Sequence, residues 1–500
     1  MAKSSFSRRE FLKISALSSS AFAVGGCTSF NQYFMGDKRD LSDEVIILGA
    51  GAAGLAAGFA LKKKKIPYRV FEASSRLGGR VQTVPIFPEG GPVAELGAEF
   101  FEEAHQSIFN LAKELNLNVN EIKGSKGQEA HLFHFSGRTY HVKDLQAKLK
   151  TLSGPLRRVR EDLFREQDVI LTYKNAQQFE RSAYYDSLSL AELLQSWSRE
   201  VDPLILKLIE VQAVERWGAD ASDLSSIHFL QTLDAEGSSL LAGRSTYRME
   251  GGLTRLTSTL YGRVAGVIPS YFVKMRHVLT EISEHKGVFT LTFQTEQGKE
   301  VYRARNIICT LPFSKLKEVK GLLDLQFSAL KKQVIFEQAY ATHTKGALAF
   351  DNPFWRKKGT QPANLGNFTG DFLTQKIWDS GRTQEGLQGL LTFQRGGSGG
   401  ATAGAEAATQ AISDLEIFYP GLDEKKWRDS QVINWSQMPW SRGSMAYFKK
   451  DQYMRFKGVA GEADYNGRFL FAGEHTSIKF AGTLHGALQS GLDAAAKLSI

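Results

Sequence analysis

The sequence predicts an α/β fold built around a Rossmann-type nucleotide-binding domain. Three observations predict it. A buried apolar strand at 45–48 runs directly into a GxGxxG turn and an alanine-rich helix. A second strand, 68–71, ends at the acidic residue Glu72. At 500 residues the chain is too long for one ordinary domain and long enough for two, so we expect a second domain beside the first.

The first 27 residues have the pattern of an export signal. Arg8 and Arg9 precede Glu10, and an apolar stretch follows at 14–26, which is the charged region plus short apolar region of a secretory signal. The paired arginines resemble a twin-arginine signal, read by a translocon for folded proteins, although an ordinary signal would also carry such charges. The run 24–27 resembles a bacterial lipobox ending at Cys27. We therefore expect a lipidated Cys27, a polar tether at 28–42 and a periplasmic protein that meets the membrane only through this anchor.

Composition excludes several classes of protein. Hydrophobic residues make up 42% and charged residues 23%, as in soluble globular proteins. The formal net charge is +9, but residues 1–26 hold four basic residues and one acidic residue, so 3 of these charges belong to the signal. No basic stripe interleaved with aromatic residues is present, which argues against nucleic-acid binding. The run Lys62 to Lys65 is interpreted as the solvated end of a helix. No metal site is expected.

The remaining elements follow from hydrophobic periodicity. Residues 105–243 read as mostly helical, with apolar spacing of three and four at 108–115 and 190–197. Alternating strands are expected around 268–310. A glycine-rich loop at 396–400 precedes a helix at 405–418. Cys309 lies in an apolar run, so it is interpreted as a buried, inert thiol, and no intrachain disulfide is expected.

Each glycine of the first turn has a steric role. Gly49 permits the tight turn, Gly51 lets a pyrophosphate approach the backbone, and Gly54 lets the helix lie close to the strand. The helix N-terminus at Ala53 then faces the anion. Glu72 lies at the spacing needed to bind the hydroxyl pair of a ribose, which argues against a 2′-phosphate, and Ala73 adjoins it.

Beyond this turn lies the segment Arg76-Leu77-Gly78-Gly79-Arg80. It resembles the RxGGR segment of the flavin-containing amine oxidase family. The resemblance continues over nearly the whole chain from about residue 43. Stretches 94–99, 250–253, 471–476 and 482–491 match further family signatures. The resemblance implies FAD, with Glu474 on the ribityl chain and the helix from about Leu484 directed at the flavin pyrimidine. The FAD contacts implied by it are Arg76, Gly79, Arg80, Leu96, Gly97, Ala98, Glu99, Val278, Gly473, Glu474, Thr483 and Leu484.

Two positions match residues that the family uses in chemistry. Lys345 matches the lysine that holds a water beside flavin N5, where it assists oxygen reduction or proton transfer. Trp435 matches the tryptophan that lies along the flavin. In the monoamine oxidase branch a cysteine bonds the flavin, but the matching stretch 441–447 has none, so the resemblance implies non-covalent FAD.

The substrate cage departs from the monoamine oxidases. Met445 and Thr483 occupy the positions of their two aromatic rings, which removes the cation–π walls for a small primary amine. Residues 482–487 look more like polyamine oxidases and lysine demethylases, which accept longer, secondary amines. An amino-acid oxidase would need an arginine for the carboxylate, and none can be assigned from spacing. His475 and His485 are interpreted as structural hydrogen-bonding residues rather than acid–base groups.

The resemblance implies an FAD-binding domain assembled from 43–104, 244–320 and 433–500, and a substrate domain with a mixed sheet and helices from 105–243 and 321–432. The implied reaction transfers a hydride equivalent from the carbon beside an amine nitrogen to flavin N5. An imine leaves, and O2 is reduced to hydrogen peroxide. Two alternatives stay open: a desaturase or protoporphyrinogen-oxidase-like enzyme acting on an apolar substrate, and an electron-transfer or binding subunit without oxidase turnover.

Overall fold

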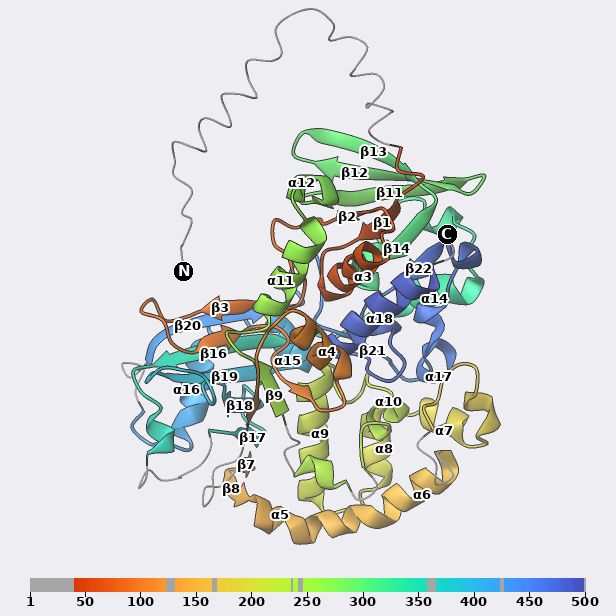
Figure 1. Cartoon of the computed structure of the whole chain (residues 1–500). Helices are drawn as coiled ribbons and strands as arrows, with labels where there is room; N and C mark the ends of the chain where they lie inside the picture. Colours follow the sequence, from red (N-terminus) through yellow and green to blue (C-terminus); the bar gives the residue numbers. More distant parts are fainter. Residues whose placement is uncertain are drawn as a thin grey trace, which may run out of the picture.

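A computed structural model describes residues 40–122, 131–163, 169–234, 237–241, 246–357, 366–422 and 427–498 (Figure 1). The signal at 1–27, Cys27 and most of the tether at 28–42 lie outside the described residues. The division into an FAD-binding and a substrate domain stays a prediction, and the architecture below is described by its sheets.

A five-stranded parallel sheet lies directly below the strands β11, β12 and β13 in Figure 1. Its order is β10-β2-β1-β14-β22, and every neighbouring pair is parallel. Each of β1, β2 and β22 is buried at every position, as expected for short apolar strands covered on both faces. The predicted α/β fold is confirmed. The strands are β1 (Val45–Leu48), β2 (Tyr68–Phe71), β10 (Val273–Lys274), β14 (Asn306–Cys309) and β22 (Phe469–Phe471).

Three helices pack around this sheet: α3 (Ala52–Lys63), α11 (Thr254–Ala265) and α18 (Leu484–Lys497). Close contact depends on glycine. A Cβ on Gly491 of α18 would lie 2.1 Å from the Ala53 carbonyl oxygen of α3, and a Cβ on Gly58 of α3 would lie 3.2 Å from Val264 of α11. The first and last helices of the described chain therefore touch backbone to backbone.

A three-stranded antiparallel sheet covers the top of the molecule in Figure 1. It consists of β11 (Val278–His285), β12 (Val288–Thr295) and β13 (Gly298–Ala304), with every second residue of β12 buried. Phe293 of β12 stacks on Phe71 at the end of β2, with ring centroids 4.4 Å apart. This contact fixes the start of β11 next to the end of the parallel sheet.

A seven-stranded mixed sheet forms the second large layer, in the order β20-β16-β19-β18-β17-β7-β8. Alternate residues of β16 face opposite sides. Leu348 and Phe350 pack against helix α16 (Ala407–Glu416), while Ala347 and Ala349 pack against the β3–β4 hairpin. The strands are β7 (Leu132–Phe135), β8 (Arg138–His141), β16 (Thr344–Phe350), β17 (Phe368–Gly370), β18 (Lys376–Asp379), β19 (Gly389–Arg395) and β20 (Trp427–Asn434).

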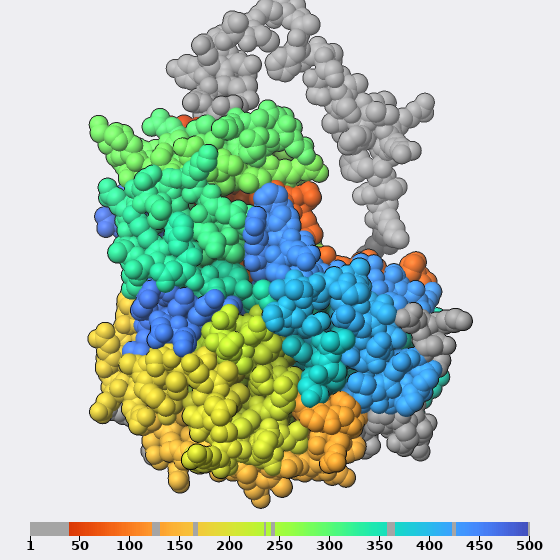
Figure 2. All heavy atoms as spheres, turned by 180° about the vertical axis from the view of Figure 1, so that it is seen from behind, coloured from red at the N-terminus to blue at the C-terminus, as the bar shows by residue number. Residues whose placement is uncertain are grey.

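Residues 105–243 are mostly helical, as predicted, with three exceptions: β6 (Val119–Ile122), β7 and β8. Seen from behind in Figure 2, the yellow surface of residues near 180–230 adjoins dark blue residues near 450, and Asp451 N donates to the Asp186 carbonyl at 2.7 Å. The helices are α4 (Gln106–Glu114), α5 (Val142–Leu149), α6 (Ser153–Leu163), α7 (Ser182–Asp186), α8 (Leu190–Ser196), α9 (Pro203–Trp217) and α10 (Ser226–Leu230).

The predicted glycine-rich loop at 396–400 is wrong, because residues Gly397–Thr402 form the short helix α15. The glycines are needed for packing. A Cβ on Gly400 would lie 2.0 Å from the Thr342 carbonyl oxygen, and one on Gly399 would lie 2.4 Å from the Arg395 side chain. Tertiary contact therefore overrides the poor helix propensity of glycine.

The remaining elements are short. They are β3 (Thr83–Pro85), β4 (Val93–Glu95), β5 (Phe101–Glu102), β9 (Thr246–Met249), α12 (Pro269–Phe272), α13 (Phe313–Leu316), α14 (Ala329–Glu337), β15 (Ala339–Tyr340), β21 (Ala446–Tyr447) and α17 (Tyr453–Phe456), with 3-10 turns at Lys150–Leu152, Ala176–Gln178, Ser238–Leu240, Leu322–Asp324, Phe354–Arg356, Val459–Gly461, Tyr465–Gly467 and Glu474–Thr476. Within the described ranges, no helix combines the length and apolar character needed to cross a membrane.

Candidate functional site

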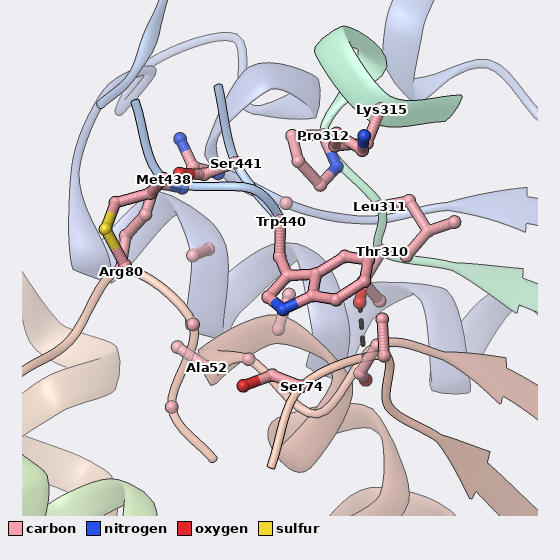
Figure 3. A pocket seen from close by; sticks show the side chains of 18 of the residues that line it. Ala52, Ser74, Arg80, Thr310, Leu311, Pro312, Lys315, Met438, Trp440 and Ser441 are labelled. Atoms are coloured by element: carbon pink, nitrogen blue, oxygen red, sulfur yellow. Dashed lines mark hydrogen bonds between the residues drawn. The ribbon is translucent and has the colours of Figure 1, made fainter. Parts of the chain in front are cut away.

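A cavity of about 550 Å³ runs along the carboxyl ends of the parallel strands and reaches the seven-stranded sheet. Residues after β1, β2, β14 and β22 line one part of it, and β16 and β19 line another. In open α/β sheets, ligands bind at this edge. Figure 3 shows the part near the parallel sheet, where the Trp440 indole projects into the cavity between Ser74 and Thr310.

The β1–α3 turn forms one wall. Gly49 has φ +105°, a conformation that favours glycine. A Cβ on Gly54 would lie 1.9 Å from the Gly49 carbonyl oxygen, so this glycine is required for the helix to start here. Gly51 lines the cavity and a Cβ there would meet only Gly79 Cα, at 3.8 Å. Ala53 also lines it, and the first turn of α3 has no acidic residue, which leaves its N-terminus suited to an anion.

Glu72 and its neighbours line the cavity at the end of β2. The carboxylate is oriented by two backbone donors: Ala50 N at 2.7 Å from Oε2 and Ser74 N at 2.8 Å from Oε1. Burial raises the pKa of Glu72 above its usual value, against these hydrogen bonds. Ala73 and Val278, the first residue of β11, line the cavity beside it.

The RxGGR segment crosses the middle of the cavity. Arg76 holds its own loop by donating to the carbonyl oxygens of Val81 at 2.9 Å and Leu77 at 3.0 Å. Gly79, with φ +60°, passes the β1–α3 turn so closely that its Cβ would lie 3.3 Å from Gly51 Cα. Arg80 Nη1 lies 2.6 Å from Glu474 Oε1, and both residues line the cavity.

Glu474 ties three segments together at the cavity wall. Besides Arg80, it accepts from Ala446 N at 3.1 Å and Gly482 N at 3.0 Å. Gly473 and Leu484 line the cavity next to it. Thr483 caps α18, its Oγ1 accepting from Gly486 N at 3.0 Å. The helix thus begins at Leu484, as predicted, with its N-terminus at the cavity.

Lys345 and Trp435 line the end of the cavity nearest the seven-stranded sheet. Both are buried, and both are held by the segment after β4. Trp435 Nε1 donates to the Leu96 carbonyl at 2.8 Å. Lys345 Nζ donates to the Gly97 carbonyl at 3.0 Å and to Glu99 Oε2 at 2.8 Å. Gly97 and Ala98 line the cavity as well.

The structure brings most of the predicted site residues to this one cavity, including Met445 and Thr483, the two predicted to form the substrate pocket. Three others do not line it. Gly54 packs against Gly49, and Leu96 and Glu99 support Trp435 and Lys345 from behind.

The two C-terminal histidines lie outside the cavity wall. His485 Nδ1 is 2.5 Å from Ser107 Oγ, and burial lowers the pKa of His485 to about 4. This agrees with a structural hydrogen-bonding residue. His475 packs on Phe313 with ring centroids 4.5 Å apart, and burial lowers its pKa to about 3. Neither ring nitrogen of His475 has a hydrogen-bond partner among the described residues, so the interpretation of His475 as a hydrogen-bonding residue stays a prediction.

Sequence reasoning missed several wall residues. Thr310, Leu311 and Pro312 directly follow β14, and their position after an apolar parallel strand is a signal that could have found them. His343 of the β15–β16 turn also lines the cavity, with Nε2 2.7 Å from the Glu215 carbonyl and Nδ1 2.6 Å from Ser444 Oγ. Burial lowers the pKa of His343, so this ring is neutral. No local sequence motif indicates that His343 would line the cavity.

Comparison with known proteins gives a consistent result. Residues 52–499 match a family described as flavin containing amine oxidoreductase. The flavin-dependent L-tryptophan oxidase RebO of Lentzea aerocolonigenes is 25% identical over 479 residues, covering 90% of this chain and 97% of its own. Lysine-specific histone demethylase 1 homolog 2 of Oryza sativa subsp. japonica is 25% identical over 480 residues, covering 92% of this chain and 57% of its own. The structure of a putrescine oxidase bound to putrescine superposes with a TM-score of 0.75 at 18% identity, covering 91% of this chain and 99% of that one.

Proposed function

Because the chain belongs to the flavin containing amine oxidoreductase family and is therefore a flavin-dependent amine oxidase, we propose that it binds FAD non-covalently and oxidises a carbon–nitrogen bond of a polyamine-like or other secondary amine. The observation that carries the proposal is the continuous cavity that Glu72, Glu474 and Lys345 share. These residues lie far apart in the sequence, and each matches a different part of the family pattern.

The residues of the cavity fit FAD. Gly51 and the N-terminus of α3 offer an uncrowded backbone for a pyrophosphate. Glu72, oriented by Ala50 N and Ser74 N, would accept from ribose hydroxyls. Glu474 would hold the ribityl chain, and the N-terminus of α18 would face the pyrimidine, where negative charge collects on reduction. In the described part of the chain the sole cysteine is Cys309, which is buried and does not line the cavity, in support of non-covalent binding.

When bound, the flavin supplies the redox chemistry, taking a hydride equivalent from the carbon beside a neutral amine nitrogen and passing the electrons to O2 to give hydrogen peroxide, while water hydrolyses the released imine. The protein orients the reactants and moves protons. Lys345 Nζ would hold a water at the cavity end and deliver a proton during oxygen reduction. Trp435 would exclude bulk water, because its indole is fixed by the Leu96 carbonyl.

An amine is favoured over an amino acid by the distribution of arginines. Among the described residues that line the cavity, the arginines are Arg76 and Arg80. Arg76 is bound to backbone carbonyls of its own loop, and Arg80 is paired with Glu474. A carboxylate clamp would need an arginine on the cavity wall near Lys345, and Arg248, which lies 3.7 Å from the Glu99 carboxylate, does not line the cavity.

The test is anaerobic mixing of the purified flavoprotein with polyamines, secondary and primary monoamines and L-amino acids. We expect loss of the oxidised flavin absorbance with the longer secondary amines and peroxide on admission of air. Bleaching only by L-amino acids would overturn the substrate assignment. Bleaching by none of these compounds would favour the desaturase-like or electron-transfer alternatives.

We also propose export through a twin-arginine route and lipid anchoring at Cys27 in the periplasm. The support is the sequence of residues 7–27. Cell fractionation tests it: the wild-type protein should sediment with membranes, and Cys27→Ser should be released into the soluble periplasmic fraction. Cytoplasmic retention of an Arg8→Lys, Arg9→Lys variant would support the export route. Unchanged export of that variant would contradict it.

A further inference from the structure

We infer that Glu99 is the positioning residue for Lys345: from behind the cavity wall, its carboxylate keeps the ammonium charged and leaves one N–H for a partner inside the cavity. The inference rests on the role proposed for Lys345. It adds a residue that does not line the cavity and whose side chain therefore would not touch substrate or cofactor.

The first step is the arrangement of donors around Lys345 Nζ. An ammonium has three N–H donors. One is taken by Glu99 Oε2 at 2.8 Å and a second by the Gly97 carbonyl at 3.0 Å. The described residues offer no third acceptor, and Lys345 lines the cavity. One donor therefore remains for a water or a reacting group.

The second step is charge. The side chains of Lys345 and Glu99 are only 5% and 3% exposed, so bulk water does little to stabilise either charge. Burial disfavours the ammonium, whereas a carboxylate within about 4 Å favours it. Glu99 is the nearest carboxylate to Lys345. Removing its charge would therefore favour loss of the lysine proton.

The third step is that Glu99 is itself fixed. Trp378 Nε1 lies 3.2 Å from both carboxylate oxygens. Arg248 Nη2 lies 3.7 Å from Glu99 Oε1, which is farther than Lys345. The carboxylate thus has a set position, and its shortest charged contact is with Lys345. Other charged or titratable groups near the pair are Glu95 of β4, Arg248 of β9, His343 before β16, Glu215 of α9 and Lys376 of β18.

The first measurement observes the lysine directly. Flavin-loaded protein is labelled with 13Cε-lysine, and the Lys345 resonance is assigned by its loss in Lys345→Met. The titration is followed above pH 8, where Glu95, whose pKa burial raises to about 7, has already ionised. In Glu99→Gln we expect Lys345 to lose its proton at least about one pH unit lower than in the wild type. The same midpoint in both proteins would overturn the inference.

The second measurement is a double-mutant cycle on the reoxidation of reduced flavin by O2. Glu99→Gln should slow reoxidation at high pH, and the pH at which the rate falls should move down by the same interval as the lysine titration. In a Lys345→Met background the same substitution should have no further effect, because Glu99 acts only through Lys345. Equal slowing in both backgrounds would contradict the inference.

Asp379 provides a matched control. It is a buried carboxylate with the same kinds of partners, accepting from Trp355 Nε1 at 2.7 Å and from Arg356 Nε at 2.5 Å, but it does not line the cavity. Asp379→Asn should lower thermal stability and leave the lysine titration and the reoxidation rate unchanged. A change in that titration equal to the change in Glu99→Gln would show a general loss of structure and overturn the inference.

The two proposals fail in different ways. If Lys345→Met reoxidises at the wild-type rate, the role of Lys345 in oxygen reduction is wrong, while the NMR titration still decides whether Glu99 sets its charge. If Lys345→Met is slow but Glu99→Gln titrates and reoxidises like the wild type, the positioning role alone is wrong.

Discussion

Lys345 is the single side chain on which the proposed oxygen chemistry depends. Lys345→Met keeps the length of the side chain but removes the donor. We expect flavin reoxidation by O2 to slow by about 100-fold or more, with anaerobic substrate binding largely kept. Stopped-flow absorbance measures both. Lys331→Met is the control, because Lys331 is an equally buried lysine that binds Asp464 away from the cavity. A wild-type rate in Lys345→Met would remove Lys345 from the mechanism.

Glu95 gives the stability a defined pH dependence. Burial raises its pKa from 4.5 to about 7, although Leu253 N and Thr83 Oγ1 donate to it. Between these two values the unfolded chain releases the proton while the folded chain keeps it, so stability falls as the pH rises through this window and levels off above about 7. In Glu95→Gln this contribution is absent.

We therefore expect the stability of Glu95→Gln, relative to the wild type, to rise with pH. Relative to the wild type, Glu95→Gln should gain up to about 3 kcal/mol in unfolding free energy between pH 4 and pH 8. Urea unfolding at fixed FAD concentration across this range measures it. A difference between the two proteins that does not change with pH would contradict the raised pKa.

At the scale of elements, the β1–α3 turn depends on glycine for packing as much as for conformation. Gly54→Ala would place a Cβ 1.9 Å from the Gly49 carbonyl oxygen. We expect a loss of roughly 3 kcal/mol or more and a lower melting temperature. Gly262→Ala, at an exposed position of helix α11 where an added Cβ would meet nothing within 4 Å, should instead gain about 1 kcal/mol. Differential scanning calorimetry of both variants measures these changes in melting temperature. Equal changes in Gly54→Ala and Gly262→Ala would contradict the packing argument.

The elements that the sequence predicts well are those with local signals. An apolar run predicts β1, three glycines predict the turn into α3, and an acidic residue marks the end of β2. Helix α18 begins at its predicted residue. β8 was missed although it pairs with β7 across the local turn at 136–137, whereas β7 also pairs in parallel with β17, and Leu132 meets Phe368 across more than 200 residues. Periodicity within one segment cannot report such a partner. Helix α15 was missed for the same reason, since its glycines serve contacts with Thr342.

At the scale of the whole molecule, the cavity joins segments from both ends of the described chain. We expect added FAD to slow amide exchange in apoprotein at 49–54 and 473–487 together, because binding stabilises only the assembled state. Hydrogen exchange with mass spectrometry measures this. The exposed hairpin turn at 136–137, whose residues do not line the cavity, is the internal control. Protection of one end without the other would contradict a shared ligand.

The candidate site could be predicted from sequence only where single residues match a family pattern. Lys345 and Glu474 were found that way, whereas the pairing of Lys345 with Glu99 was not. Lys345 and Glu99 are 246 positions apart, and they meet because β16 packs its small side chains against the β3–β4 hairpin. That contact is a property of the folded sheets, not of either segment.

The packing of α18 on α3 also sets an order of events in the cell. Gly491 touches the backbone of Ala53, so α3 gains this neighbour only after residue 491 has been made. At about 5–20 residues per second, a ribosome needs roughly 20–90 s for the roughly 440 residues that separate Ala53 from Gly491. During that interval the nascent nucleotide site lacks one side. A chaperone that shields the β1–α3 segment during synthesis would have its longest task here.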